Sequence, residues 1–276
     1  MLSYQHGYHA GHFADVVKHL TLARLLNYMT LKDKPLFYLE THSGRGLYDL
    51  QSSQASKTKE HCQGIDILWQ QKASLPSVFA PYIEIINEAN KTEKLRFYPG
   101  SPYIAIDMLR EQDRIYCCEL HPREFEYLQK LPHPDKRVFY SHSDGIASLN
   151  ALIPPPERRG LIFIDPSFEV KTEYKEIPKA IHAAYQRFST GVYCLWYPLV
   201  DQFYHDQLLR TMAKIGAESA LRVEFSMINS KQIGMTGCGL WIINPPFTLA
   251  EDLKIALQYL KGLFNPANSS YLIETI

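Results

Sequence analysis

The sequence predicts an α/β fold, with a Rossmann-like, mostly parallel sheet. Three observations support this prediction. Short apolar segments alternate with segments of helical periodicity along most of the 276 residues, as is typical of parallel sheets covered by helices on both faces. A glycine-bearing turn follows the first apolar segment, as it does in nucleotide-binding sheets. Three consecutive later segments each end in an acid, namely Glu119, Asp144 and Asp165.

The composition is that of an ordinary globular protein. Hydrophobic residues make up 46% and charged residues 21% of the chain, enough for one domain that carries an insertion. The formal net charge is zero, so any nucleic-acid site must be a local patch. The five cysteines include no Cys-x-x-Cys pair, which predicts reduced thiols in the cytoplasm. We recognise neither a signal peptide nor an apolar run long enough for a membrane, and expect no membrane partner.

The first part of the chain predicts a helix, then a strand, then a turn. Apolar residues recur at helical spacing through 14–29, and Asp15 stands in the first turn, where the helix dipole favours an acid. Residues 35–40 predict the first strand. The glycines of the following segment 41–46 would let the backbone approach a ligand closely. An ordinary strand-to-helix turn is an equally good interpretation of that segment.

Residues 50–96 differ in character from the rest. A polar, serine-rich stretch is followed by two helical patterns with no strand between them. Because a βαβ unit needs only one helix before its next strand, we expect 50–96 to be a helical subdomain inserted into a single domain that spans 1–276.

Regular alternation resumes after this insertion. We expect further helices at 102–109, 122–130, 177–188 and 207–215, and further strands at 114–119, 138–140, 160–165, 191–197, 220–225 and 239–243. The last two strands are expected to form an antiparallel hairpin, and 239–243 to be the final strand of the sheet.

The acids at the strand ends indicate a ligand site. Carboxyl ends of parallel strands share one edge, where open α/β sheets bind ligands. Glu119 would accept hydrogen bonds from ribose hydroxyls, and Asp144 would face the amine of an adenine ring. A surface carboxylate is the alternative for each acid alone, but three in succession favour a site.

The strand at 160–164 ends in Asp165-Pro166-Ser167-Phe168. Enzymes that methylate exocyclic amines of bases carry a similar element, Asp/Asn-Pro-Pro-Tyr/Phe. In such an enzyme Asp165 and the Pro166 carbonyl would accept hydrogen bonds from the amine, and Phe168 would stack on the base. Asn244-Pro245-Pro246-Phe247 matches this pattern more closely, but it follows the strand expected to be last. We therefore interpret it as a structural turn.

The histidines near the N-terminus allow three interpretations. His6, His9 and His12 are three residues apart, and His19 follows. A metal site is one interpretation, but no Cys or acid cluster of familiar spacing completes the ligand set. We favour solvated or packed histidines and expect no metal. In the third interpretation, Lys18 and His19 line a pocket for cofactor or RNA.

Several motifs, in order, carry a family resemblance. They are Met1-Leu2-Ser3-Tyr4 with His6, His9-Ala10-Gly11, Ala14-Asp15-Val16, Lys18-His19, Asp33-Lys34-Pro35, Thr41-His42, Tyr98-Pro99-Gly100-Ser101-Pro102, Arg110-Glu111-Gln112-Asp113, Glu119-Leu120-His121-Pro122, Arg158-Arg159-Gly160-Leu161-Ile162, Leu195-Trp196-Tyr197-Pro198 and Asn244-Pro245-Pro246. Together they resemble the bacterial large-subunit ribosomal RNA adenine-N6 methyltransferase J family (RlmJ). The likeness runs from Met1 to about Phe247.

The resemblance implies a class I S-adenosylmethionine-dependent methyltransferase that modifies the N6 amine of an adenine in 23S ribosomal RNA. It implies Asp165 as the catalytic acceptor and Tyr4 as a contact of the RNA, and we expect Lys18 to join Tyr4. The family normally has Pro-Tyr where this chain has Ser167-Phe168. The cofactor contacts that it implies are His19, His42, Ser101, Glu119, Asp144, Gly145 and Asp165.

Two alternatives stay open at this stage. The enzyme could methylate DNA or another RNA, or the chain could be a non-catalytic nucleic-acid-binding protein with a vestigial cofactor fold. For the ribosomal enzyme we expect a cytoplasmic monomer. Its substrate would be deproteinised RNA or an early assembly intermediate.

Overall fold

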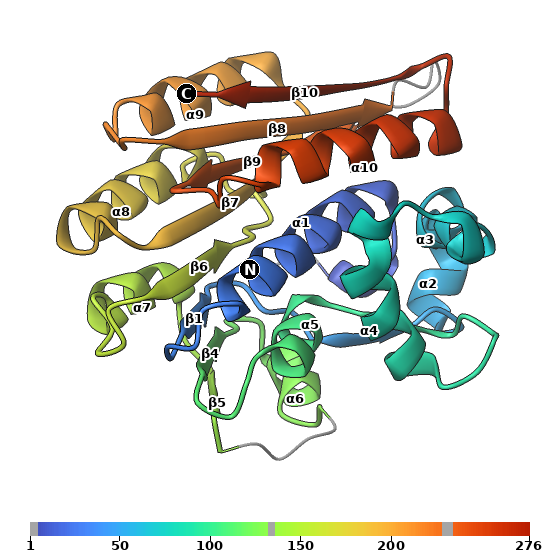
Figure 1. Cartoon of the computed structure of the whole chain (residues 1–276), viewed down its shortest axis with the longest axis horizontal. Helices are drawn as coiled ribbons and strands as arrows, with labels where there is room; N and C mark the ends of the chain where they lie inside the picture. The colour runs from blue at the N-terminus through green and yellow to red at the C-terminus, as the bar shows by residue number, and fades with distance from the viewer. Residues whose placement is uncertain (1–4, 132–135, 228–233) are drawn as a thin grey trace.

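The computed structural model describes residues 5–131, 136–227 and 234–276, and its centre is an eight-stranded sheet (Figure 1). The strand order is β10-β8-β9-β7-β6-β1-β4-β5. The mutually parallel strands are β1 (Phe37–Glu40), β4 (Arg114–Cys118), β5 (Val138–Ser141), β6 (Gly160–Ile164) and β7 (Val192–Leu199). The antiparallel part consists of β8 (Ala220–Met227), β9 (Gly237–Ile243) and β10 (Ser269–Thr275). The predicted α/β fold with a mostly parallel sheet is confirmed, as is the antiparallel pairing of β8 with β9.

Helices cover both faces of this sheet, because its strands are apolar on both sides. Leu161 and Phe163 of β6 belong to one core, and Ile162 and Ile164 belong to the other, as the two-residue period of a strand requires. The first core is covered by α1 (Phe13–Thr30), α5 (Ser101–Met108), α6 (Pro122–Leu128) and α10 (Leu249–Phe264). The second core is covered by α7 (Gly145–Leu152), α8 (Glu173–Arg187) and α9 (Gln202–Ala213).

The segment between β1 and α5 is largely helical. Two short strands at its ends, β2 (Leu47–Asp49) and β3 (Phe97–Pro99), pair antiparallel as a separate ribbon. Between them lie α2 (Ser53–Thr58), α3 (Ile65–Gln70) and α4 (Ala80–Asn90), and α4 packs against α1 (Figure 1). Short 3-10 helices occur at His6–Tyr8, Glu60–Gln63, Lys72–Ser74 and Ser77–Phe79. We did not predict the ribbon, because three residues are too few to show alternation.

The expectation that 239–243 is the last strand was wrong. After it come α10 and then β10, which pairs antiparallel with β8 and forms the edge of the sheet. Most side chains of β10 are partly or fully exposed, so its sequence lacks the apolar run of a central strand. The starts of α8 and α9 also lie earlier than predicted. The first turn of α8 is mostly polar, and the two aromatic residues in the first turn of α9, Phe203 and Tyr204, are adjacent and show no helical spacing.

All five cysteines are free thiols, and four of them are buried. Cys117 and Cys118 face the two different cores. No helix in the described ranges is both long and apolar enough to cross a membrane.

Candidate cofactor and substrate site

The candidate site lies at the carboxyl ends of the parallel strands. Glu119, Asp144 and Asp165 follow β4, β5 and β6, so the parallel pairing brings all three to one edge of the sheet. A fourth acid, Glu40, ends β1 at the same edge and is fully buried. We did not single out Glu40 from the sequence, although an acid that ends an apolar strand was the same signal.

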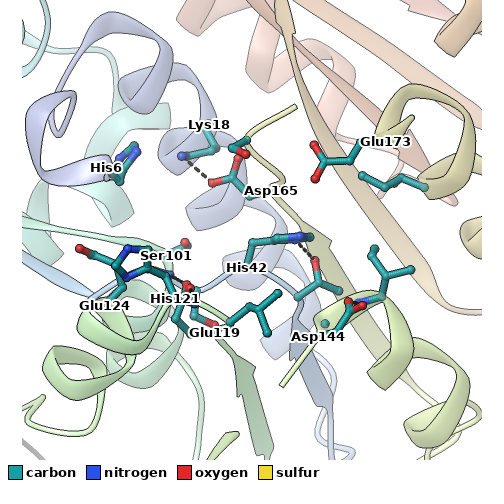
Figure 2. A pocket seen from close by; sticks show the side chains of 18 of the residues that line it. His6, Lys18, His42, Ser101, Glu119, His121, Glu124, Asp144, Asp165 and Glu173 are labelled. Atoms are coloured by element: carbon teal, nitrogen blue, oxygen red, sulfur yellow. Dashed lines mark hydrogen bonds and ion pairs between the residues drawn. The ribbon is translucent and has the colours of Figure 1, made fainter. Parts of the chain in front are cut away.

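A cavity of about 280 Å³ opens at this edge (Figure 2). Every residue that the family resemblance implied as a cofactor contact lines it, namely His19, His42, Ser101, Glu119, Asp144, Gly145 and Asp165. These residues come from α1, from the loops after β1, β4, β5 and β6, and from the starts of α5 and α7. The fold therefore gathers residues that are up to 146 positions apart, counted from His19 to Asp165.

Glu119 fastens the turn after β1 to the end of β4. The backbone N–H of Gly44 donates to its Oε2 at 2.7 Å, and that of His121 donates to its Oε1 at 2.6 Å. Burial raises the pKa of Glu119, although these two hydrogen bonds favour the charged form. Each carboxylate oxygen keeps a second acceptor position for a ligand hydroxyl.

The start of α7 packs directly on the end of β1. Asp144 caps this helix, because its Oδ1 accepts from the N–H groups of Ile146 and Ala147 at 2.8 and 3.4 Å. A Cβ on Gly145 would overlap the carbonyl oxygen of Thr41. Glycine is therefore needed here for close backbone approach, a reason that the sequence alone did not reveal.

Two histidines in the cavity are held neutral. Burial lowers the pKa of His42 to about 4, and its Nδ1 lies 2.7 Å from Thr41 Oγ1. Burial, followed by the charge of Lys18, also lowers the pKa of His19 well below its usual value. The Nδ1 atom of His19 lies 2.7 Å from the hydroxyl of Tyr98. Neither imidazole adds positive charge to the cavity at neutral pH.

Glu40 anchors the floor of the site. The hydroxyl of Ser101 donates a short hydrogen bond to its Oε1, and the hydroxyl of Tyr38 donates to its Oε2 at 3.0 Å. Burial raises the pKa of Glu40 well above its usual value. This contact fixes Ser101 at the first turn of α5, where it lines the cavity.

Asp165 is paired with a buried lysine from α1. Lys18 Nζ lies 2.7 Å from Asp165 Oδ2 (Figure 2), and it lies 2.9 Å from Asp15 Oδ1. Burial by itself lowers the pKa of Lys18, but the two carboxylates raise it well above its usual value, so Lys18 is charged. His6 Nε2 lies 2.8 Å from Asp15 Oδ2. The sequence predicted Lys18 at the site but not its contact with Asp165.

A second cavity of about 770 Å³ adjoins the first, and Lys18, Asp165 and Ser167 line both. Pro166 and Phe168 also line the second cavity. The ring of Phe168 is only 3% exposed and packs on Tyr174, with centroids 4.4 Å apart. We had expected an open stacking face at Phe168, but in this structure most of that ring is covered.

The N-terminal histidines do not gather around one point. His9 Nδ1 lies 2.9 Å from Glu60, while His12 Nδ1 is buried and has no hydrogen-bond partner in the structure. Within the described residues, the one cluster with the geometry of metal ligands is His61, Cys62 and Asp66. Tyr4, the predicted RNA contact, lies outside the described residues.

Asn244 lies at the opposite edge of the sheet from Asp165, because it follows β9, which runs antiparallel to β7. Its backbone has a φ of +53°. Its side-chain amide donates to the carbonyls of Ser189 and Gly191, both at 2.7 Å. This geometry agrees with the interpretation of Asn244 as a structural turn.

Comparisons with known proteins agree with these observations. A family model described as "Ribosomal RNA large subunit methyltransferase D, RlmJ" matches residues 33–276. The chain is 42% identical to a Haemophilus influenzae protein named Ribosomal RNA large subunit methyltransferase J, over 100% of this chain and 99% of the relative. It is 39% identical to the Escherichia coli protein of the same name, over 98% and 97% of the two chains. A crystal structure from Legionella pneumophila is 56% identical, with a TM-score of 0.92 over 96% of this chain and 98% of that chain.

Proposed function

This chain belongs to the ribosomal RNA large subunit methyltransferase J family, and we propose that it transfers the methyl group of S-adenosylmethionine to the N6 amine of an adenine in 23S ribosomal RNA. The observation that carries the proposal is the position of Asp165, which lines both cavities. The first cavity would hold the methyl donor and the second the target adenine. Their meeting point is where methyl transfer must occur.

The residues of the first cavity fit the cofactor. Glu119 offers acceptors to ribose hydroxyls, and Asp144 offers one to the adenine amine. The buried Nδ1 of His121 has no partner in the structure and lines the same cavity, so a ligand that reaches it would relieve an unsatisfied polar atom. When bound, the cofactor supplies a strongly electrophilic methyl group on a sulfonium. The neutral His19 and His42 place no like charge beside that cation.

Asp165 would position and activate the amine of the target adenine. Its Oδ2 is held by Lys18, so we assign the contact with the amine to Oδ1, together with the Pro166 carbonyl. These acceptors favour a tetrahedral nitrogen, whose lone pair is otherwise delocalised into the ring. The lone pair would then be available to take the methyl group that the cofactor supplies, and Asp165 would accept the proton that the amine gives up. In-line positioning lowers the barrier by several kcal/mol.

The other residues named from the sequence have supporting roles in this proposal. Tyr4 and Lys18 are proposed contacts of the substrate RNA, and Lys18 also orients Asp165 through their ion pair. Phe168 forms the wall against which the target base rests once it leaves its stack. We further propose that 50–96 is an inserted subdomain, and that a cytoplasmic monomer acts on deproteinised or early-assembly RNA.

The test is methyl transfer in vitro. Wild-type protein is incubated with labelled S-adenosylmethionine and either transcribed 23S ribosomal RNA or DNA of the same sequence, and the products are digested and analysed by mass spectrometry. We expect N6-methyladenosine in the RNA alone. Transfer to DNA only, or tight RNA binding with no affinity for the cofactor, would support the two alternatives instead.

A further inference from the structure

Four aromatic rings form a continuous row that leads out of the second cavity. Phe168 contacts Tyr174, with centroids 4.4 Å apart, Tyr174 stacks on Tyr204 at 5.2 Å, and Tyr204 meets Phe203 edge-on at 5.3 Å. Phe168 and Tyr174 line the cavity beside Asp165. The row therefore connects the proposed position of the target base with the protein surface.

The fold places this row at the edge of the sheet that carries the site. β6 and β7 are parallel, and α8 and α9 begin shortly after their carboxyl ends. Tyr174 stands in the first turn of α8, and Phe203 and Tyr204 stand in the first turn of α9. Asp201 caps α9 by accepting from the N–H groups of Phe203 and Tyr204, which fixes where the two rings emerge.

The outer end of the row is open to solvent. Phe203 is 72% exposed, and Val200, which lines the second cavity, is 48% exposed. Lys171 holds its ammonium 5.7 Å from the ring of Tyr174 and 5.0 Å from that of Tyr204. Phe203 therefore continues a row of aromatic rings that begins in the cavity. Its exposed ring offers a free aromatic face to a flat ligand.

We propose that Phe203, supported by Tyr204, is a stacking subsite for a second unpaired nucleobase of the substrate, a neighbour of the target adenine. The inference rests on the proposed function, because that function identifies the ligand of the adjoining cavity as a nucleotide. Aromatic side chains bind successive unstacked bases of single-stranded nucleic acid with little dependence on sequence. The subsite would therefore require an unpaired flanking nucleotide and accept any base there.

The charges around the row favour stacking over attraction to phosphates. Lys171 and Lys175 are exposed, but Glu169, Glu176 and Asp201 are exposed beside them. This surface carries no excess of positive charge, so few counterions would be released when RNA binds to it. Loss of Phe203 should therefore weaken RNA binding without changing the salt dependence of that binding.

The experiment compares Phe203→Ala, Phe203→Leu and Phe203→Tyr with Phe247→Ala as a matched control. Phe247 is 84% exposed but follows Asn244 at the opposite edge of the sheet. The dissociation constant is measured for an RNA hairpin with the target adenine in its loop, over a range of salt. We expect the Ala and Leu variants to bind about tenfold more weakly with an unchanged salt slope. Phe203→Tyr and Phe247→Ala should bind as the wild type does, and cofactor affinity should be equal in all variants.

A second measurement identifies the contacted base. The nucleotide beside the target is replaced by an abasic residue, and the loss of affinity is compared between wild type and Phe203→Ala. We expect a loss of about tenfold for the wild type and almost none for the variant, because the two changes remove the same contact. Equal losses in both proteins would overturn the inference.

These experiments distinguish a failure of this inference from a failure of the proposed function. If Phe203→Leu binds like the wild type, the surface is apolar rather than stacking and fits a protein partner, which overturns the inference. If Phe203→Ala is normal while Asp165→Ala transfers no methyl group, the inference fails and the proposed function stands. If wild-type protein methylates no RNA but the abasic effect depends on Phe203, the proposed function fails and the subsite stands.

Discussion

At the residue scale, Asp165 is the decisive side chain. It is ion-paired to Lys18 at 2.7 Å and stands between two cavities, whereas Asn244 ties down a turn at the far edge of the sheet. Two motifs that look alike in the sequence are therefore separated by the direction of the strands that precede them. One variant of each motif therefore tests which of the two is catalytic.

We expect Asp165→Ala to lower kcat by at least roughly 100-fold, because the acceptor acts mainly in the transition state. Asn244→Ala should keep its turnover and lose only stability, since its amide satisfies two backbone carbonyls. Initial rates on ribosomal RNA and thermal unfolding of both variants check this. The Asp165→Ala substitution leaves the charge of Lys18 with only one of its two carboxylate partners. The fold of this variant is therefore verified by circular dichroism. A dead Asn244→Ala beside an active Asp165→Ala would reverse our assignment.

Glu119 should act on cofactor affinity rather than on chemistry. Glu119→Ala removes acceptors that serve ribose hydroxyls, and hydrogen bonds to charged groups contribute about 1.5–3 kcal/mol each. We expect the dissociation constant of S-adenosylmethionine to rise by at least tenfold, with a smaller change in kcat at saturating cofactor. Isothermal titration calorimetry measures the affinity directly. An unchanged dissociation constant would remove Glu119 from the cofactor site.

At the element scale, the sequence predicted every strand of the eight-stranded sheet except β10, and it missed the two short strands of the separate ribbon. β1, β4, β6 and β7 were found because a buried parallel strand is a continuous apolar run. β10 was missed because an edge strand is exposed along much of its length. The three acids at strand ends were predictable from position alone. The pairing of Lys18 with Asp165 was not, because it joins residues 147 positions apart through the packing of α1.

The start of α7 offers a test of backbone packing. Gly145→Ala would drive a Cβ into the carbonyl of Thr41, so α7 must shift away from β1, and we expect a loss of stability of about 1–3 kcal/mol together with weaker cofactor binding. Gly262→Ala in α10 is the matched control, because its added Cβ meets open space. That variant should be stabilised by up to about 1 kcal/mol. Chemical denaturation compares them, and equal effects would contradict the packing argument.

A half-buried carboxylate, Glu224, joins α9 to the sheet and makes this contact dependent on pH. Burial opposes ionisation of Glu224, but hydrogen bonds from His205, Arg222 and Tyr197 hold its pKa at about 2. All three donors reach its Oε1 within 2.9 Å. The ordinary pKa is 4.5, so the stabilisation is complete above that pH and is lost as the pH falls towards 2.

Glu224→Gln should therefore destabilise the protein by roughly 2–3 kcal/mol at pH 7, as a depression of this size implies. The difference between wild type and variant should shrink as the pH is lowered from about 4.5 towards 2. Denaturant midpoints measured at several pH values check both the magnitude and the direction. A difference that stays constant with pH would show that the ionised form of Glu224 is not what stabilises the contact.

At the scale of the whole molecule, the two halves of the sheet have different roles. The first cavity lies over the ends of β1, β4, β5 and β6, and the second lies beside the ends of β6 and β7, while the other half of the sheet consists of the antiparallel strands β9, β8 and β10. Tyr271 and Ile273 of β10 pack against the first core, and α10 covers the same region. The C-terminal strand should therefore affect stability and solubility more than the cofactor site.

Deletion of residues 266–276 tests this division. The truncation removes the pairing of β10 with β8 and leaves β8 as an open edge, which is a template for association with other chains. It also uncovers the apolar contacts of Tyr271 and Ile273, so we expect a loss of at least about 3 kcal/mol and concentration-dependent self-association. The folded fraction should keep its affinity for S-adenosylmethionine, because β7 and β9 lie between β8 and β6.

Thermal unfolding, sedimentation velocity and calorimetry measure the stability, the self-association and the cofactor affinity of the truncated protein. A truncated protein that stays monomeric and equally stable would show that β10 adds nothing to the sheet, whereas lost affinity in a folded monomer would show that the two halves are coupled.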